Sequence, residues 1–170
     1  MLYRELLKES QSRIKKRGEY VNSYSPNQLF VAGAKWMLDF STLPKFKENR
    51  YSKRTIQCYG LGKYGLCISS TILYLALINE ITILDFFIAI FFFYFIESHL
   101  VFVFPLLIDN QSSPLKKSIL MAYKIGLPKV FINILPIAGY MILGLFKVRK
   151  PFYNWHIGCG AIVIWYENEI

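Results

Sequence analysis

The feature that most constrains this chain is an apolar block that begins near residue 64. Within this block, residues 86–96 form a continuous stretch without a charged side chain. Hydrophobic residues make up 54% of the 170 residues and charged residues 18%, against roughly 45–50% and about 25% in average soluble domains. A soluble fold of this size cannot bury so much apolar surface. The sequence therefore predicts an integral membrane protein and excludes a disordered, collagen-like or disulfide-rich chain.

The block divides into four predicted spans, at about 64–82, 85–108, 130–146 and 152–166. A helix rises about 1.5 Å per residue and needs about 20 apolar residues to cross a bilayer, so the first two segments suit an antiparallel hairpin. The predicted fold class is an all-α integral membrane protein with about four transmembrane or membrane-embedded helices. A membrane helical domain, 64–170, would follow a basic, partly amphipathic, helical N-terminal region, 1–63.

The third and fourth spans leave a choice open. Pro136, Gly139 and Gly144 permit the third span either to cross or to break and leave on the side it came from. A full crossing places three basic residues outside and 17 inside, whereas re-entry places all 20 inside. We favour four crossings. The fourth span has Trp155, Trp165 and Tyr166 near its ends, as in an interfacial aromatic belt.

The charge pattern predicts contact with anionic lipid rather than nucleic acid. Lys and Arg number 20 against 11 acidic residues, and 13 of the 20 precede the apolar block, as on the cytoplasmic flank of a membrane protein. No nucleic-acid motif or zinc-finger spacing accompanies them. The first 25 residues hold no continuous apolar run, so we expect a cytoplasmic N-terminus at a plasma or inner membrane.

Two segments outside the spans are amphipathic. A Ser25, Pro26, Gln28 capping box starts the first, whose apolar stripe includes Trp36 as an expected interfacial anchor, with packing under the membrane helices as the alternative. The second starts at Pro114 and ends at Gly126. The residues expected to meet the membrane interface are Trp36, Lys15, Lys16, Arg17, Lys116 and Lys117.

A literal GxGxxG pattern stands at Gly60, Gly62 and Gly65. This pattern binds a pyrophosphate when a strand precedes it and an amphipathic helix follows. Residues 55–59 would be that strand and Glu80 the acid that binds ribose. Because the following segment is apolar on every side, we favour an irregular connector over 42–63 that leads into the bilayer.

Ionisable residues inside the apolar block are the candidates for function, because a charge at the bilayer centre costs at least about 2.5–3.5 kcal/mol. Glu97 and His99 interrupt the most apolar stretch and are the candidate catalytic pair. Positions two apart on a helix point about 200° apart, so these side chains cannot share a metal ion. Asp109, His156 and Cys159 are the other polar candidates, and a composite site of Glu97, His99 and His156 remains open.

No established cofactor or metal signature is present. Only two histidines and three cysteines occur, without a CxxC pair, an HExxH motif, a P-loop or a nucleophile elbow. We therefore expect no cofactor and no metal.

Two functions remain. The first is a non-catalytic small subunit or partner-binding component of a membrane complex, joined to a protein partner or a second copy. The alternative is a membrane-embedded enzyme that acts on a lipid or isoprenoid-linked substrate at the cytoplasmic leaflet through Glu97 and His99. A proton or ion pathway through Glu97 and Asp109 is weaker, because two acids make a short relay.

Overall fold

A computed structural model describes residues 2–17, 29–42, 51–78, 82–146 and 152–170. It confirms the all-α fold class, since 87% is helix and the described residues contain no strand. The helices are α1 (Tyr3–Arg17), α2 (Leu29–Phe40), α3 (Lys53–Ala76), α4 (Ile83–Leu100), α5 (Val103–Ile108), α6 (Pro114–Ile125), α7 (Leu127–Leu145) and α8 (Tyr153–Glu169).

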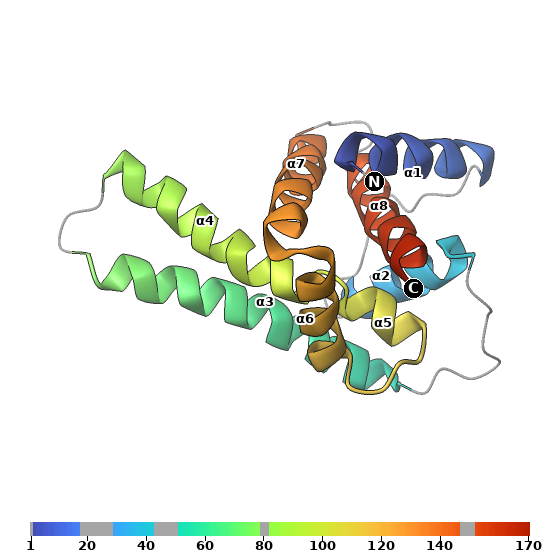
Figure 1. Ribbon diagram of the computed structural model, residues 1–170, viewed down its shortest axis with the longest axis horizontal. Helices are drawn as coiled ribbons and strands as arrows, with labels where there is room; N and C mark the ends of the chain where they lie inside the picture. The colour runs from blue at the N-terminus through green and yellow to red at the C-terminus, as the bar shows by residue number, and fades with distance from the viewer. Residues whose placement is uncertain (1, 18–28, 43–50, 79–81, 147–151) are drawn as a thin grey trace.

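Two parts are evident in the molecule (Figure 1). Helices α3 and α4 run antiparallel and project as a long arm, while the other helices gather into a body around the base of α3. The Tyr74 and Phe92 rings, 5.0 Å apart, join the two helices, and the Tyr74 hydroxyl donates to Asp85 at 3.0 Å. The expected helix pair is therefore present, and its distal part extends beyond the body.

Helix α3 begins eleven residues earlier than the predicted span, since it starts at Lys53 rather than at 64. Ser52 caps it by accepting a hydrogen bond from the Thr55 amide at 3.1 Å. The predicted connector over 42–63 is thus wrong from residue 53 onward, and the strand required before a nucleotide-binding glycine loop is helix instead. The Ser25, Pro26, Gln28 capping box and Glu80 lie outside the described residues.

The second predicted span is divided. Helix α4 ends at Leu100 and the short α5 follows at Val103, where Pro105 has no amide hydrogen to donate to Val101. A helix is present where the second amphipathic segment was predicted, as α6. It ends at Gly126, whose φ of 98° favours glycine and lets α7 begin at once. Helix α7 then continues through Pro136 without a break.

Helix α8 is the central helix of the body. Its residues are buried almost without interruption from Asn154 to Tyr166, and it packs against α7 and α1. Added Cβ atoms would collide with Met141 at Gly158 and with Ser10 at Gly160, so these glycines permit the close packing. Trp165 and Tyr166 are 0% and 1% exposed. The predicted aromatic belt is therefore wrong at these residues, because protein covers them.

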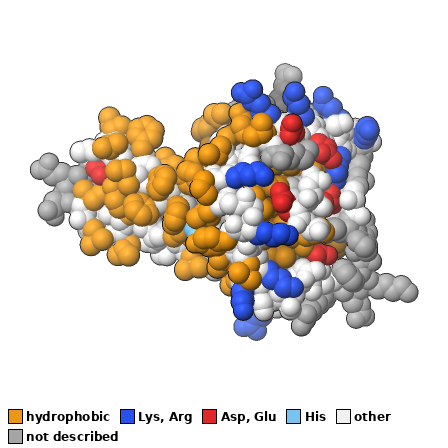
Figure 2. All heavy atoms as spheres, viewed as in Figure 1, with side chains coloured by type: hydrophobic (Ala, Val, Ile, Leu, Met, Phe, Trp, Pro, Cys, Tyr) orange, Lys and Arg blue, Asp and Glu red, His pale blue; other side chains and the backbone are white. Residues whose placement is uncertain are grey.

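Two stretches of the described chain are long and apolar enough to cross a membrane, Ile83–Ile108 and Leu127–Leu145. In each, 39% of the most apolar window is buried, and the remainder is half-buried or exposed. Four crossings are not established, since α3 and α8 do not meet the same criterion. Side chains on the arm are mainly apolar on the visible face, whereas Lys and Arg gather on the body (Figure 2).

Candidate functional site

A buried ion pair lies where the arm joins the body. Lys63 Nζ of α3 lies 2.8 Å from Glu97 Oε1 of α4, and the two side chains are only 3% and 8% exposed. Cys67, one turn after Lys63, points its thiol at the other Glu97 oxygen from 3.7 Å. The spacing of four residues puts Lys63 and Cys67 on one face of α3. Both side chains on that face contact the Glu97 carboxylate.

Aromatic rings complete the surroundings of the Lys63 ammonium. Its Nζ lies 5.1 Å from the centroid of the Tyr64 ring and 5.6 Å from that of Phe104. Ring faces attract a cation but do not accept a strong hydrogen bond. The Phe30 ring stacks on both of these rings, with centroids 5.6 and 5.9 Å away. Helix α2 thereby closes the base of the arm.

The ion pair forms part of the wall of a cavity of about 420 Å³. Residues of α2, α3, α4, α5, α7 and α8 surround it. Most of the wall is aliphatic or aromatic. The titratable side chains on it are Lys63, Tyr64, Tyr94, Glu97, His156 and Cys159. An apolar cavity with a few convergent polar groups is the usual form of a small-molecule site.

His156 enters this cavity from α8 and is 1% exposed. Its Nδ1 lies 2.6 Å from the Phe152 carbonyl oxygen, and since a carbonyl only accepts, Nδ1 carries a proton. The Trp36 ring meets the imidazole edge to face at 4.6 Å. Trp36, expected as an interfacial anchor, thus lines the cavity in the structure.

His99 and Asp109 lie elsewhere. His99 does not line the cavity but contacts the Phe95 and Tyr123 rings, with Nδ1 2.8 Å from the Phe95 carbonyl oxygen. Asp109 accepts a hydrogen bond from the Tyr166 hydroxyl at 2.6 Å. The structure therefore brings together Glu97, His156 and Cys159, and it places His99 and Asp109 apart from them.

Sequence reasoning missed Lys63, which was assigned to the end of the connector. One signal was present, since Lys63 precedes Cys67 by four residues and would share a helix face with it. A helix that starts at Lys53 turns this residue inward instead of leaving it in water. Within the described ranges, no group of three or more His, Cys, Asp or Glu side chains stands close enough to hold a metal ion.

The basic residues expected at the membrane interface differ in their surroundings. Lys15, Lys16 and Lys116 are exposed, whereas Lys117 is half-buried. The Lys117 Nζ donates to the Gln111 amide oxygen at 2.7 Å. The Arg17 side chain lies outside the described residues.

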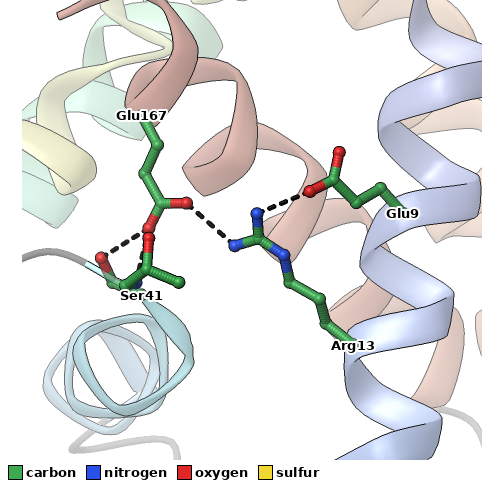
Figure 3. A network of polar contacts seen from close by, with 5 residues as sticks. Glu9, Arg13, Ser41 and Glu167 are labelled. Carbon is green, nitrogen blue, oxygen red and sulfur yellow. Dashed lines mark hydrogen bonds and ion pairs between the residues drawn. The ribbon is translucent and has the colours of Figure 1, made fainter.

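A second polar cluster fastens the N-terminal helix to the end of α8 (Figure 3). The Arg13 guanidinium donates to Glu9 at 2.6 Å and to Glu167 at 2.9 Å. Glu167 also accepts from the Ser41 hydroxyl at 2.8 Å and the Thr42 amide at 2.7 Å. Burial raises the pKa of Glu167, but these hydrogen bonds outweigh it and hold the pKa below its ordinary value. Likewise, burial lowers the pKa of Arg13, and its two carboxylate partners raise it above the usual value.

Comparison with protein-family models, with curated proteins and with solved structures finds no match to this chain.

Proposed function

We propose that this chain is an integral membrane protein that serves as a non-catalytic component of a membrane complex. The arm and the outer face of α7 would lie in the bilayer. The body, with its charged surface, would lie at the cytoplasmic interface. The Lys63 and Glu97 pair carries the proposal, because Glu97, the buried acid of the described residues, is paired with a cation from the neighbouring helix.

The surface of the arm supports bilayer insertion. Large apolar side chains along α3 and α4 are more than one-third exposed, and some are well above that: Leu73 63%, Leu77 77%, Ile83 78%, Leu84 65% and Phe87 65%. Contiguous apolar surface on this scale is covered in a cell by lipid or by another protein. Because α3 and α4 pair with each other along their length, lipid suffices as the cover for the remaining faces.

The internal polar contacts support a structural role for the ionisable residues. Lys63 meets Glu97, Tyr166 meets Asp109, and the Asn133 side-chain oxygen accepts from the Tyr3 amide at 2.9 Å. Each contact joins two different elements. Polar side chains often join helices in this way inside membranes.

An enzyme acting on a lipid is the second candidate, and one observation favours it. Glu97, His156 and Cys159 share the wall of one cavity, as an acid, a base and a nucleophile of an active site would. Under this alternative, Glu97→Gln would remove activity and leave the amount of protein in the membrane unchanged. Under the structural proposal, the same variant would lower the amount of folded protein.

Lysine substitutions on the arm test the proposed insertion. Phe87→Lys and Phe91→Lys replace side chains that are 65% and 51% exposed. Inside a bilayer each would cost about 2.5–3.5 kcal/mol, so we expect the double variant to be lost from carbonate-washed membranes. Leu2→Lys, just before α1 and at a site that is 61% exposed, is the matched control and should be retained. Equal retention of the control and the double variant would contradict insertion.

Association with a partner is tested separately by purification of the wild-type chain in mild detergent. We expect an assembly larger than one chain in light scattering. A monodisperse monomer would count against the proposed role in a complex.

A further inference from the structure

The cavity described above carries an inference that rests on the proposed membrane insertion. We propose that it binds an uncharged amphiphile taken from the bilayer. The polar head of this molecule accepts a hydrogen bond from Lys63, and its hydrocarbon tail lies along the apolar wall. The volume of about 420 Å³ falls within the range of small-molecule sites, roughly 300–1,000 Å³.

The N–H donors of Lys63 indicate a ligand that carries a hydrogen-bond acceptor. An ammonium group has three N–H donors. Among the described residues, Glu97 accepts one of them at 2.8 Å, and the Tyr64 and Phe104 rings offer only their faces. A buried donor without an acceptor costs roughly 1–3 kcal/mol. A hydroxyl or carbonyl oxygen in the cavity would supply that acceptor.

The charge of the pair selects an uncharged head group. Lys63 and Glu97 neutralise each other inside an apolar wall. An anionic head would meet the Glu97 carboxylate, and a cationic head would meet the Lys63 ammonium, in surroundings that screen charge poorly. A neutral oxygen acceptor avoids both repulsions.

The rest of the wall suits a hydrocarbon tail. The apolar side chains that line the cavity include Phe30 and Trp36 of α2, Ile134 and Met141 of α7, and Ile162 of α8. Such side chains offer burial of apolar surface, at about 25 cal/mol per Å², and no hydrogen bonds. The tail is thereby recognised by shape and apolar character alone.

The cavity reaches the surface beside the arm, where the lining is apolar. Leu29 of α2, Ile68 of α3 and Ile142 of α7 line it and are themselves 39%, 51% and 45% exposed. A cavity that takes its ligand from water would be expected to have polar side chains around its opening. This apolar rim favours transfer from the acyl-chain region of the membrane.

Tryptophan fluorescence in lipid vesicles tests the proposal. Trp36 and Trp155 line the cavity, so Trp165→Phe leaves only these two reporters. The probe is a dibrominated long-chain alcohol, whose bromine atoms quench nearby indoles, and the comparison probe is the fatty acid of equal length at a pH where it is ionised. We expect saturable quenching by the alcohol and at least tenfold weaker apparent affinity for the acid. Equal affinity would overturn the assignment of an uncharged head.

Glycine substitutions separate cavity binding from quenching in the bilayer. A Cβ at Gly33, which lines the cavity, meets nothing within 4 Å, so Gly33→Leu fills the space without a backbone collision. Gly62→Leu is the matched control, because Gly62 is equally open and does not line the cavity. We expect at least a tenfold loss of affinity for the first variant alone.

A second filling variant, Ala138→Leu on the α7 wall, covers the case in which Gly33→Leu does not fold. Saturable quenching that survives filling from either wall would overturn the proposal, as would its absence from the unfilled protein. Failure here leaves the membrane insertion intact, because the lysine substitutions on the arm test insertion without any ligand.

Discussion

Lys63 and Glu97 meet 2.8 Å apart at the base of the arm, each almost completely buried. The contact joins α3 to α4 at the point where both helices enter the body. It also forms part of the wall of the cavity described above. The stability of the fold and the proposed ligand recognition therefore depend on the same pair. Substitutions that remove both charges can separate these two roles.

Removing one partner of the pair should be far more harmful than removing both. Lys63→Met leaves a buried carboxylate without its cation, and we expect a loss of about 3–5 kcal/mol in the free energy of unfolding. Lys63→Met combined with Glu97→Leu removes both charges and should recover most of that loss. Denaturant unfolding in detergent micelles, arranged as a double-mutant cycle, measures the coupling. Additive effects of the two substitutions would contradict a direct pairing.

The glycines of α3 should differ sharply in their tolerance of a side chain. A Cβ at Gly60 collides with the Phe30 ring, whereas one at Gly62 meets nothing within 4 Å. We expect Gly60→Ala to lower stability by about 1–3 kcal/mol. Gly62→Ala should raise it slightly, because alanine favours a helix. Thermal unfolding of the two variants checks the difference, and equal melting temperatures would contradict the packing of α2 on α3.

Acid should weaken the attachment of α1 to α8. The pKa of Glu167 is lower in the folded protein than its ordinary value of 4.5. The stabilisation that ionised Glu167 contributes is therefore complete above about pH 4.5. It is lost as the pH falls through the pKa that Glu167 has in the folded protein. Glu167→Gln should lower the melting temperature at neutral pH, and the gap to wild type should close on acidification. A gap that is constant with pH would contradict the role of the charge.

Part of this architecture could be predicted from the sequence. Apolar runs and Gly or Pro boundaries located α6, α7 and α8 to within a few residues, and the start of α4 to within two, because these signals are local. The opposed directions of Glu97 and His99 also followed from helix geometry. Of these two residues, Glu97 lines the cavity and His99 does not.

The rest could not be predicted, for physical reasons. Hydropathy does not distinguish a helix buried in lipid from one buried in protein, so it predicts a span for the segment of α8 and does not predict its packing against α1, α2 and α7. Lys63 falls at the end of the predicted connector because the apolar stretch begins just after it. Its place on the buried face is set by Glu97, which is 34 residues away in the sequence, and a local pattern carries no record of such a partner.

The surroundings of the arm are the most direct test of the account. A nitroxide label at Phe91→Cys, with the native cysteines replaced, reports in vesicles whether dissolved oxygen or an aqueous nickel chelate collides with it more often. A label at Lys16→Cys on α1 is the aqueous reference. We predict that oxygen dominates at position 91 and the chelate at position 16, as lipid around the arm requires. Dominance of the chelate at position 91 would place the arm in water and contradict the account.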